Sequence, residues 1–383
     1  MKTAPVYVTG IASFLPNDPV GNDDMEGILG QIGPRPSRVR RTILRNNGIV
    51  SRHYAIDPET GDYTHTNAGM TAEAVRRLER DDAPLSTLDC LAAGTTIADQ
   101  IAPSHGLMVH GELGLPPCEV IGTSGICLSG MSSFKYACMG VATGEHRRAV
   151  ATGSELVSPL LRAENFSAEA QQQLEAVESR PEIAFEKDFL RWMLSDGAGA
   201  VMLESEPGPG PVSLRVDWVD LISYAGEMET CMYCGAVKQE DGSLRGWPVM
   251  DQDERARTSA MALKQDVKLL NEHVMDYTVY HAMSRLRQKH GVTPDEFDWF
   301  LPHYSSQYFR GQVYDRMQRA DMEIPYERWF TNLSTCGNTG SASIYIMLAE
   351  LFGEGRLQPG QRILCYIPES GRFSTSFLAL TVV

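Results

Sequence analysis

Cys127 stands where a strand is expected to end and a helix to begin, within the segment Glu119 to Gly144. Apolar and β-branched residues over 119–123 predict a short strand, which the following glycines interrupt. After Cys127, apolar residues recur at helical spacing as far as Gly144, a typical helix stop. Unpaired backbone N–H groups and the helix dipole at such a junction stabilise a thiolate, so the segment predicts acyl transfer through a thioester. The alternative is a structural cysteine that fills a crowded turn.

His303 and Asn338 occupy matching positions later in the chain. His303 follows a strand expected over 297–302, and Asn338 lies in a glycine-rich turn that precedes an expected helix. Thr95 and Cys127 are 32 residues apart, and His303 and Asn338 are 35 residues apart, so the order of elements repeats. We therefore expect two similar α/β halves in which Cys127 and Asn338 are counterparts facing a shared cleft, with His303 beside them.

The composition excludes several classes of protein. Apolar residues make up 43% of the 383 residues and charged residues 22%, which is typical of a globular chain. The net charge of −15 argues against a nucleic-acid binder. No apolar stretch approaches the roughly 20 residues of a membrane span, and glycine and prolines interrupt the N-terminal segment where a signal peptide would be apolar, so a soluble cytoplasmic protein is expected.

The cysteines predict neither a disulfide framework nor a metal centre. Eight cysteines are scattered along the chain, and the one closely spaced pair, Cys231 and Cys234, has no second pair to complete a zinc site. Reduced thiols, no metal and no cofactor are expected.

The spacing of apolar residues predicts the elements that must position these side chains. Strands are expected over 6–11, 88–96, 148–156, 194–205 and 212–221, and helices over 25–31, 68–81, 105–113 and, as one long helix, 254–288. Asp23 or Asp24 is expected to cap the first helix. Glu155, at the end of a strand, is placed near either the pocket or a dimer interface.

A proline- and glycine-rich stretch over 207–211 is the best boundary between domains. It divides the chain into an N-terminal half, 1–206, that carries the nucleophile and a C-terminal half, 207–383, that carries His303 and Asn338. A polar insertion over 158–191, with helical propensity over 168–177, is expected to act as a cap or a dimerisation element.

Five motifs fall in one order along the chain: LRNNGIVSRHYA, ICLSG around Cys127, LSDGAGAVML, the pair Pro302-His303, and GNTGSAS. Together they resemble the thiolase superfamily, and specifically β-ketoacyl-acyl-carrier-protein synthase III, over residues 5–383. The resemblance implies a thiolase-like, duplicated α-β-α-β-α layered fold and a homodimer. It also implies a nucleophilic Cys127, with His303 and Asn338 donating hydrogen bonds to the thioester carbonyl of the second substrate. Backbone N–H groups at Cys127 and near Gly371 are expected to bind the other oxyanion.

Two departures from the family pattern concern the substrates. His303 is followed by Tyr-Ser-Ser where the family usually has Gln-Ala-Asn, which leaves Gln307 as its nearest support. Thr42 and Asn46 stand where the family often has the tryptophan and arginine that grip the adenine of coenzyme A. This favours an acyl carrier protein over coenzyme A thioesters as the donor, because the acidic surface of a carrier would suit the chain's local arginines: Arg35, Arg38, Arg40, Arg41, Arg45, Arg310 and Arg316.

A third departure places Glu369 in the closing loop, where the family has glycines. Glu369 is interpreted either as an additional general base or as a surface residue paired with Arg372, and the structural role is preferred.

The motifs FLPNDPV, RRTILRNNGI, THTNAGMTAEA and PESGRFS most resemble the condensing enzymes that make dialkylresorcinols. That resemblance implies a ketosynthase that joins a β-ketoacyl thioester to an acyl chain held on Cys127, with cyclisation, and with Glu369 or His303 as the base. Three alternatives remain: decarboxylative synthase III activity in fatty acid initiation, acyl transfer from the same cysteine to oxygen or nitrogen, and a non-catalytic partner in a heterodimer.

Overall fold

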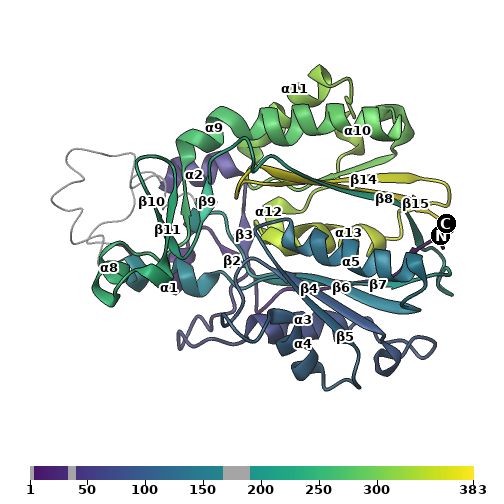
Figure 1. Cartoon of the computed structure of the whole chain (residues 1–383), viewed down its shortest axis with the longest axis horizontal. Helices are drawn as coiled ribbons and strands as arrows, with labels where there is room; N and C mark the ends of the chain where they lie inside the picture. The colour runs from purple at the N-terminus through teal and green to yellow at the C-terminus, as the bar shows by residue number, and fades with distance from the viewer. Residues whose placement is uncertain (1–3, 33–39, 167–189) are drawn as a thin grey trace.

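The protein is built in five alternating layers, as Figure 1 shows for the computed structural model, which describes residues 4–32, 40–166 and 190–383. Helices α9 (Val267–Met275), α10 (Ala282–His290) and α11 (Arg310–Arg319) cover one outer face. Helices α3 (Asn67–Arg76) and α4 (His105–Leu113) cover the other, and α5 (Ser129–Thr143) and α13 (Ser343–Gly353) lie between the two layers of strands.

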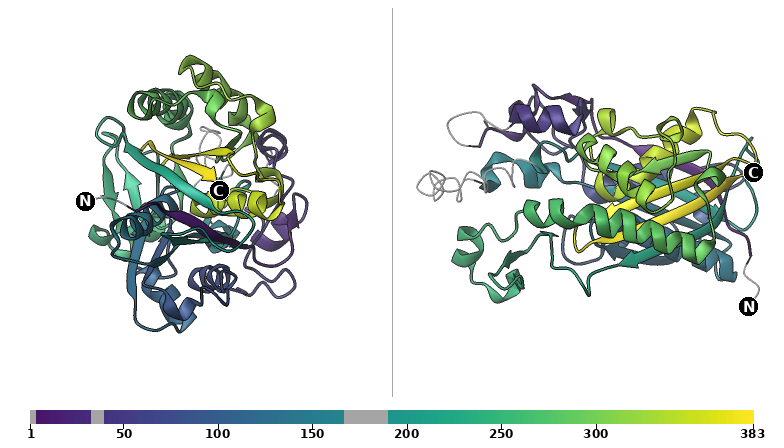
Figure 2. Two further views of the ribbon diagram at one scale, coloured as in Figure 1. Left: turned by 90° about the vertical axis from the view of Figure 1, so that its right-hand side faces the viewer. Right: turned by 90° about the horizontal axis from the view of Figure 1, so that it is seen from above.

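Nine strands form one sheet in the order β13-β14-β15-β8-β1-β7-β6-β4-β5. Their bounds are Tyr7–Phe14 for β1, Cys90–Thr95 for β4, Glu119–Ser124 for β5, Arg148–Glu155 for β6, Gly197–Glu204 for β7, Leu214–Ser223 for β8, Trp299–Pro302 for β13, Arg362–Glu369 for β14 and Ser374–Val382 for β15. The sheet folds around the two central helices, which Figure 2 shows from two further sides.

The pairing pattern repeats in the two wings of the sheet. In the first, β1 is antiparallel to β7, β7 is antiparallel to β6, and β6 is parallel to β4. In the second, β8 is antiparallel to β15, β15 is antiparallel to β14, and β14 is parallel to β13. A short antiparallel pairing of β1 with β8 joins the wings. The prediction of a duplicated, layered α/β fold is confirmed.

The strands and helices around the expected nucleophile agree closely with the sequence. Helix α4 has the predicted bounds, β5 covers the predicted strand, and α5 ends at Gly144, whose φ of 79° requires the left-handed region that glycine adopts freely. Asp24 precedes α1 (Met25–Leu29), but its side chain makes no capping hydrogen bond, so the predicted cap is wrong.

The predicted long helix over 254–288 is also wrong in its first part. Helix α8 (Gln252–Arg257) stops before Ser259, whose φ is 45°. The chain then pairs as strand β12 (Lys264–Gln265) with β9 (Met232–Tyr233). The Asp266 side chain accepts a hydrogen bond from the Leu269 N–H and starts α9, which continues through a π-helical segment, Asp276–His281, into α10.

The end of the molecule opposite the chain termini carries short elements that the sequence did not predict. They include α2 (Arg40–Asn47), β9 and the hairpin of β10 (Ala236–Lys238) and β11 (Leu244–Gly246), and they lie with α1 and α8 at that end in Figure 1. Two further short elements are the paired strands β2 (Val20–Gly21) and β3 (Ser51–Arg52) and the helix α12 (Leu333–Cys336).

Every helix in the described ranges is too short or too polar to cross a bilayer.

Candidate active site

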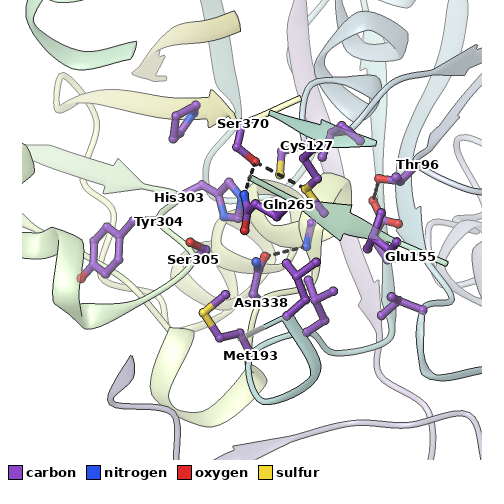
Figure 3. Close-up of a pocket in the computed structure, with 18 of the residues that line it drawn as sticks. Thr96, Cys127, Glu155, Met193, Gln265, His303, Tyr304, Ser305, Asn338 and Ser370 are labelled. Atoms are coloured by element: carbon purple, nitrogen blue, oxygen red, sulfur yellow. Dashed lines mark hydrogen bonds between the residues drawn. The ribbon is translucent and has the colours of Figure 1, made fainter. Parts of the chain in front are cut away.

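Cys127, His303 and Asn338 line one cavity of about 920 Å³, a volume that includes its open mouth. Each follows an element end: Cys127 comes after β5, His303 after β13, and Asn338 two residues after α12. Figure 3 shows the three around one space, with Thr96 and Glu155 on the side of Cys127 opposite His303. The fold therefore brings together three residues that lie far apart in the sequence.

Cys127 lies two residues before the first residue of α5, Ser129. The sequence predicts a stabilised thiolate at this position, but the pKa of the Cys127 thiol is raised well above its usual value. Burial is the main cause, and the charges of Glu369 and Glu155 add to it. The prediction of a stabilised thiolate is therefore wrong.

Glu369 explains why the start of the helix does not favour a thiolate. Its Oε2 atom accepts hydrogen bonds from the N–H groups of Ile126 and Leu128, each at 3.2 Å. The predicted pairing with Arg372 is wrong, because the Arg372 Nε donates to the Met228 carbonyl at 2.8 Å. Glu369 itself is absent from the cavity lining, whereas its neighbours Pro368 and Ser370 belong to it. Its carboxylate therefore contacts the loop over 126–128, which carries Cys127, on the side away from the cavity.

The two backbone groups expected to bind an oxyanion differ in position. Cys127 lies in the cavity wall, and within the described residues its N–H group bonds to no acceptor of another residue and contacts only its own thiol. Gly371 is not among the residues that line the cavity, and its carbonyl accepts hydrogen bonds from the N–H groups of Cys231 and Met232 at 2.9 and 3.2 Å. The Cys127 N–H is the better placed of the two.

His303 is held through its backbone. Its N–H donates to the Tyr366 carbonyl at 2.8 Å and so extends the pairing of β13 with β14. Burial lowers the pKa of the imidazole to about 4, so the ring is neutral at physiological pH and can donate a hydrogen bond. The Gln307 Oε1 accepts from the Tyr304 hydroxyl at 3.4 Å and does not contact His303, so the expected support from Gln307 is not formed.

Asn338 is fixed at both its backbone and its side chain. Its N–H donates to the Met193 carbonyl and its carbonyl accepts from the Ser195 N–H, both at 2.9 Å. Its Oδ1 atom accepts from the Gly340 N–H at 3.0 Å. This orientation leaves the Nδ2 donor to bind a substrate oxygen.

Glu155 is the carboxyl group that the cavity does contain. It accepts a hydrogen bond from the Thr96 hydroxyl and another from the Ser341 N–H at 2.9 Å. Burial raises its pKa to about 7. Gly340 packs so closely that a Cβ atom there would lie 2.7 Å from the Glu155 Oε1, which only glycine avoids.

The sequence left Glu155 between the pocket and a dimer interface, and the structure places it in the pocket. The signal was an acidic residue at the end of a strand of otherwise small and apolar residues, ATGSE, which runs through the core. Thr96 was not identified, because it is the last residue of the predicted strand over 88–96 and there resembles an ordinary polar residue.

The rest of the cavity is largely apolar. Its apolar walls come from both halves of the chain and from the unpredicted end elements: Leu160, Leu190, Met193, Met232, Leu263, Leu270, Val274, Met275, Phe309 and Val313. A polar pair lies among them, in which the Gln265 Nε2 donates to the Ser370 hydroxyl at 3.1 Å. Leu160 and Leu190 belong to the insertion over 158–191, whose residues 167–189, including its expected helix, lie outside the described ranges.

The arginines expected to bind a carrier protein fall into two groups. Arg40 pairs with Glu26 at 2.7 Å and Arg316 pairs with Asp276 at 2.8 Å, so both serve contacts within the chain. Arg41 and Arg45, on α2, and Arg310, on α11, are exposed. Helix α2 packs against the 3₁₀ turn Gln307–Phe309 that precedes Arg310, which brings these three cations to adjoining elements. Arg35 and Arg38 lie outside the described residues.

One further cluster lies at the opposite ends of β4 and β5 from the cavity. Ligand atoms of Cys90, Glu119 and His146 lie within 4.8 Å of one another, and the His146 Nε2 is 3.3 Å from the Glu119 carboxylate. Glu119 also accepts a hydrogen bond from the Tyr136 hydroxyl. The Glu119 carboxylate therefore already has partners within the chain, His146 and Tyr136.

Comparisons with known proteins agree with this geometry. Residues 287–367, which include His303 and Asn338, match the family model described as 3-oxoacyl-[acyl-carrier-protein (ACP)] synthase III C terminal. The β-ketoacyl-[acyl-carrier-protein] synthase III of Bordetella petrii is 25% identical over 367 residues, which cover 95% of each chain.

The solved structures are similar over nearly the whole chain. The tetronic acid condensing enzyme AbyA1 has a TM-score of 0.74 and 20% identity, with coverage of 98% of this chain and 99% of its own. OleA of Xanthomonas campestris, in a variant with bound lauric acid and lauroyl-CoA, has a TM-score of 0.73 and 18% identity, with coverage of 98% and 99%. The 3-oxoacyl-[acyl-carrier-protein] synthase III of Aquifex aeolicus has a TM-score of 0.68 and 18% identity, with coverage of 98% of this chain and 99% of its own. These likenesses show the thiolase-like fold, and the three comparisons together support the ketosynthase III family.

Proposed function

We propose that this protein is a condensing enzyme that holds an acyl chain as a thioester on Cys127 and joins it to the α-carbon of a β-ketoacyl thioester. The observation that carries the proposal is the convergence of Cys127, His303 and Asn338 on one apolar cavity. The apolar walls suit acyl chains, and the polar groups gather where the chemistry would occur.

In the first half-reaction, the Cys127 sulfur attacks the thioester carbonyl of the acyl donor. The carbon–sulfur bond to the donor breaks, and the donor leaves as a thiol with the proton that Cys127 gives up. The Cys127 N–H, which bonds to no other residue in the described structure, is the donor available to the carbonyl oxygen during this transfer.

In the second half-reaction, a base removes a proton from the methylene between the two carbonyls of the β-ketoacyl thioester. We assign that role to Glu155, because it is the carboxyl group in the cavity wall and its pKa of about 7 suits proton transfer at neutral pH. The neutral His303 imidazole and the Asn338 amide then donate hydrogen bonds to the enolate oxygen, and the enolate carbon attacks the acyl group on Cys127. The carbon–sulfur bond to Cys127 breaks, and the leaving sulfur takes up the proton that Glu155 removed, which restores both groups. Glu369 is the weaker candidate base, because it is not among the residues lining the cavity.

A carrier protein is the proposed donor, and dialkylresorcinol formation, by cyclisation of the condensation product, is the proposed pathway. The exposed Arg41, Arg45 and Arg310 support a carrier protein, because they lie on adjoining elements and would face an acidic partner. The buried carboxyl group in the cavity supports dialkylresorcinol formation, because condensation without decarboxylation requires a base. We further propose a cytoplasmic homodimer; β5 is an edge strand of the described sheet and so has a free edge for a second copy.

The decisive experiment has two stages. Intact-protein mass spectrometry after incubation with a panel of acyl carrier thioesters should show one acyl adduct on the wild type and none on Cys127→Ala. Addition of a β-ketoacyl carrier thioester should then discharge the adduct and yield a condensed product. No adduct on the wild type, or an adduct that persists in Cys127→Ala, contradicts the proposal.

Decarboxylative synthase III activity is the second candidate, because the Bordetella petrii enzyme of that name is similar over 95% of the chain. Malonyl carrier thioester distinguishes the two. Release of CO₂ with product formation from a malonyl donor, and none from a β-ketoacyl donor, would favour the second candidate.

A further inference from the structure

The nucleophile loop has a carboxylate behind it that the proposed reaction does not use. Glu369 ends β14, and its side chain turns away from the cavity that its neighbours Pro368 and Ser370 line. Its Oε2 atom accepts the N–H groups of Ile126 and Leu128 at 3.2 Å each, on either side of Cys127. Backbone N–H groups that enter a helix are the usual source of the positive potential that activates a cysteine.

We propose that Glu369 is a positioning residue that fixes the loop around Cys127 and, by accepting the N–H groups of Ile126 and Leu128, keeps Cys127 protonated. The inference rests on the proposed role of Cys127 as nucleophile, but not on the identity of the substrates.

Close packing holds the carboxylate in this place. A Cβ atom at Gly371 would lie 2.8 Å from the Ile126 Cγ1 and 3.1 Å from the Glu369 Oε1, and one at Gly125 would lie 3.7 Å from the Glu369 Oε2. Gly371 therefore leaves room for the Glu369 side chain to reach the loop, whereas the distance at Gly125 is an ordinary van der Waals contact. A larger residue at Gly371 would displace either the loop or the carboxylate.

The charged groups around Cys127 also favour its protonated form. Glu369 approaches from β14 and Glu155 from β6, while the titratable His303, after β13, is neutral because its pKa is about 4. No lysine or arginine lines the cavity among the described residues. Cys127 thus faces two acids and no cation, and both acids raise its pKa. A neutral thiol is also less exposed to oxidation than a thiolate.

Alkylation of Cys127 by iodoacetamide tests the proposal without any acyl substrate. The rate is measured from pH 6 to 10 by peptide mass spectrometry, with Cys127→Ser as the blank. Glu369→Gln keeps the shape of the side chain and one carbonyl oxygen that can accept both N–H groups, but it removes the charge. We expect its Cys127 pKa to fall by about one unit, with about tenfold faster alkylation at neutral pH. Glu369→Asp, which keeps the charge, and Glu59→Gln, which makes the same charge change on an exposed loop, should stay close to the wild type.

An unchanged or raised pKa of Cys127 in Glu369→Gln would overturn the proposal. A second measurement needs no variant: amide hydrogen exchange of the wild type should show protection at Ile126 and Leu128, and fast exchange at both would also overturn it. These results do not depend on the proposed condensation, because its failure would appear as a missing acyl adduct while the alkylation profile stays measurable.

Discussion

The Glu155 carboxylate accepts a hydrogen bond from the Ser341 N–H at 2.9 Å, and this contact joins the two halves of the chain beside Cys127. Glu155 comes from the first wing of the sheet, and Ser341 comes from the turn that begins α13. The Thr96 hydroxyl, one residue beyond β4, donates to the same carboxylate. The carboxyl group proposed as the base is therefore held in place by both halves.

Glu155→Gln should separate the two half-reactions. The variant should still form the acyl adduct on Cys127, because no base for carbon deprotonation is needed there. Its turnover should fall by about 10²–10⁴-fold, the usual contribution of a general base. Intact-protein mass spectrometry and steady-state product formation measure the two effects, and loss of the adduct together with turnover would contradict the assignment.

The pH dependence of kcat/KM should identify the same group. Glu155 acts as a base only when ionised, so the wild-type rate should rise with pH through about 7, the pKa of its carboxyl group. Titration of His303 does not change kcat/KM between pH 5 and 9, because its pKa is about 4. In Glu155→Gln the rise of kcat/KM near pH 7 should disappear. Persistence of this rise in the variant would assign it to another residue.

Stability should also depend on Glu155. Its pKa is about 7 in the folded chain against an ordinary value of 4.5, so the folded state binds more protons between these values and the free energy of unfolding falls as pH rises through this window. Glu155→Gln removes the cost of a buried charge. Between pH 4 and pH 8, the free energy of unfolding of the variant should therefore rise by roughly 2–4 kcal/mol relative to that of the wild type. Denaturant titrations at both values measure the difference, with Glu59→Gln as the matched exposed control.

Asn338→Ala should impair condensation more than acylation. The Asn338 Oδ1 is held by the Gly340 N–H, which leaves the amide donor for the enolate oxygen of the second substrate. Loss of one such donor costs about 10²–10³-fold in the step it serves. Single-turnover measurements of acylation and of adduct discharge distinguish the steps, and equal losses in both would show that Asn338 acts earlier than proposed.

Reversal of charge on α2 should weaken carrier binding. Arg41→Glu with Arg45→Glu should raise KM for acyl carrier thioesters, most strongly at low salt, and leave KM for coenzyme A thioesters nearly unchanged. Arg147→Glu is the matched control, because Arg147 is exposed just before β6, at the opposite end of that strand from Glu155. Equal effects on both donors would place the carrier surface elsewhere.

The sequence by itself predicted the main order of elements and the three principal candidate site residues, which line one cavity, because both predictions rest on local signals. Strand, glycine turn and helix can be read around Cys127, and the repeated order pointed to His303 and Asn338. The long helix over 254–288 failed for the same reason: its helical pattern is locally sound, but the pairing of β12 with β9 is a contact between segments far apart in the sequence, and no local pattern encodes it.

Tertiary structure alone decided the protonation of the site. The start of α5 predicts an activated thiolate, yet burial raises the pKa of Cys127, and a carboxylate 241 positions further along the chain, which accepts the Leu128 N–H, adds to this. In the same way, burial and not sequence neighbours moves the pKa of Glu155 up and that of His303 down. Burial and through-space charge act between atoms that folding brings together, so the sequence names these groups but the fold sets their charges.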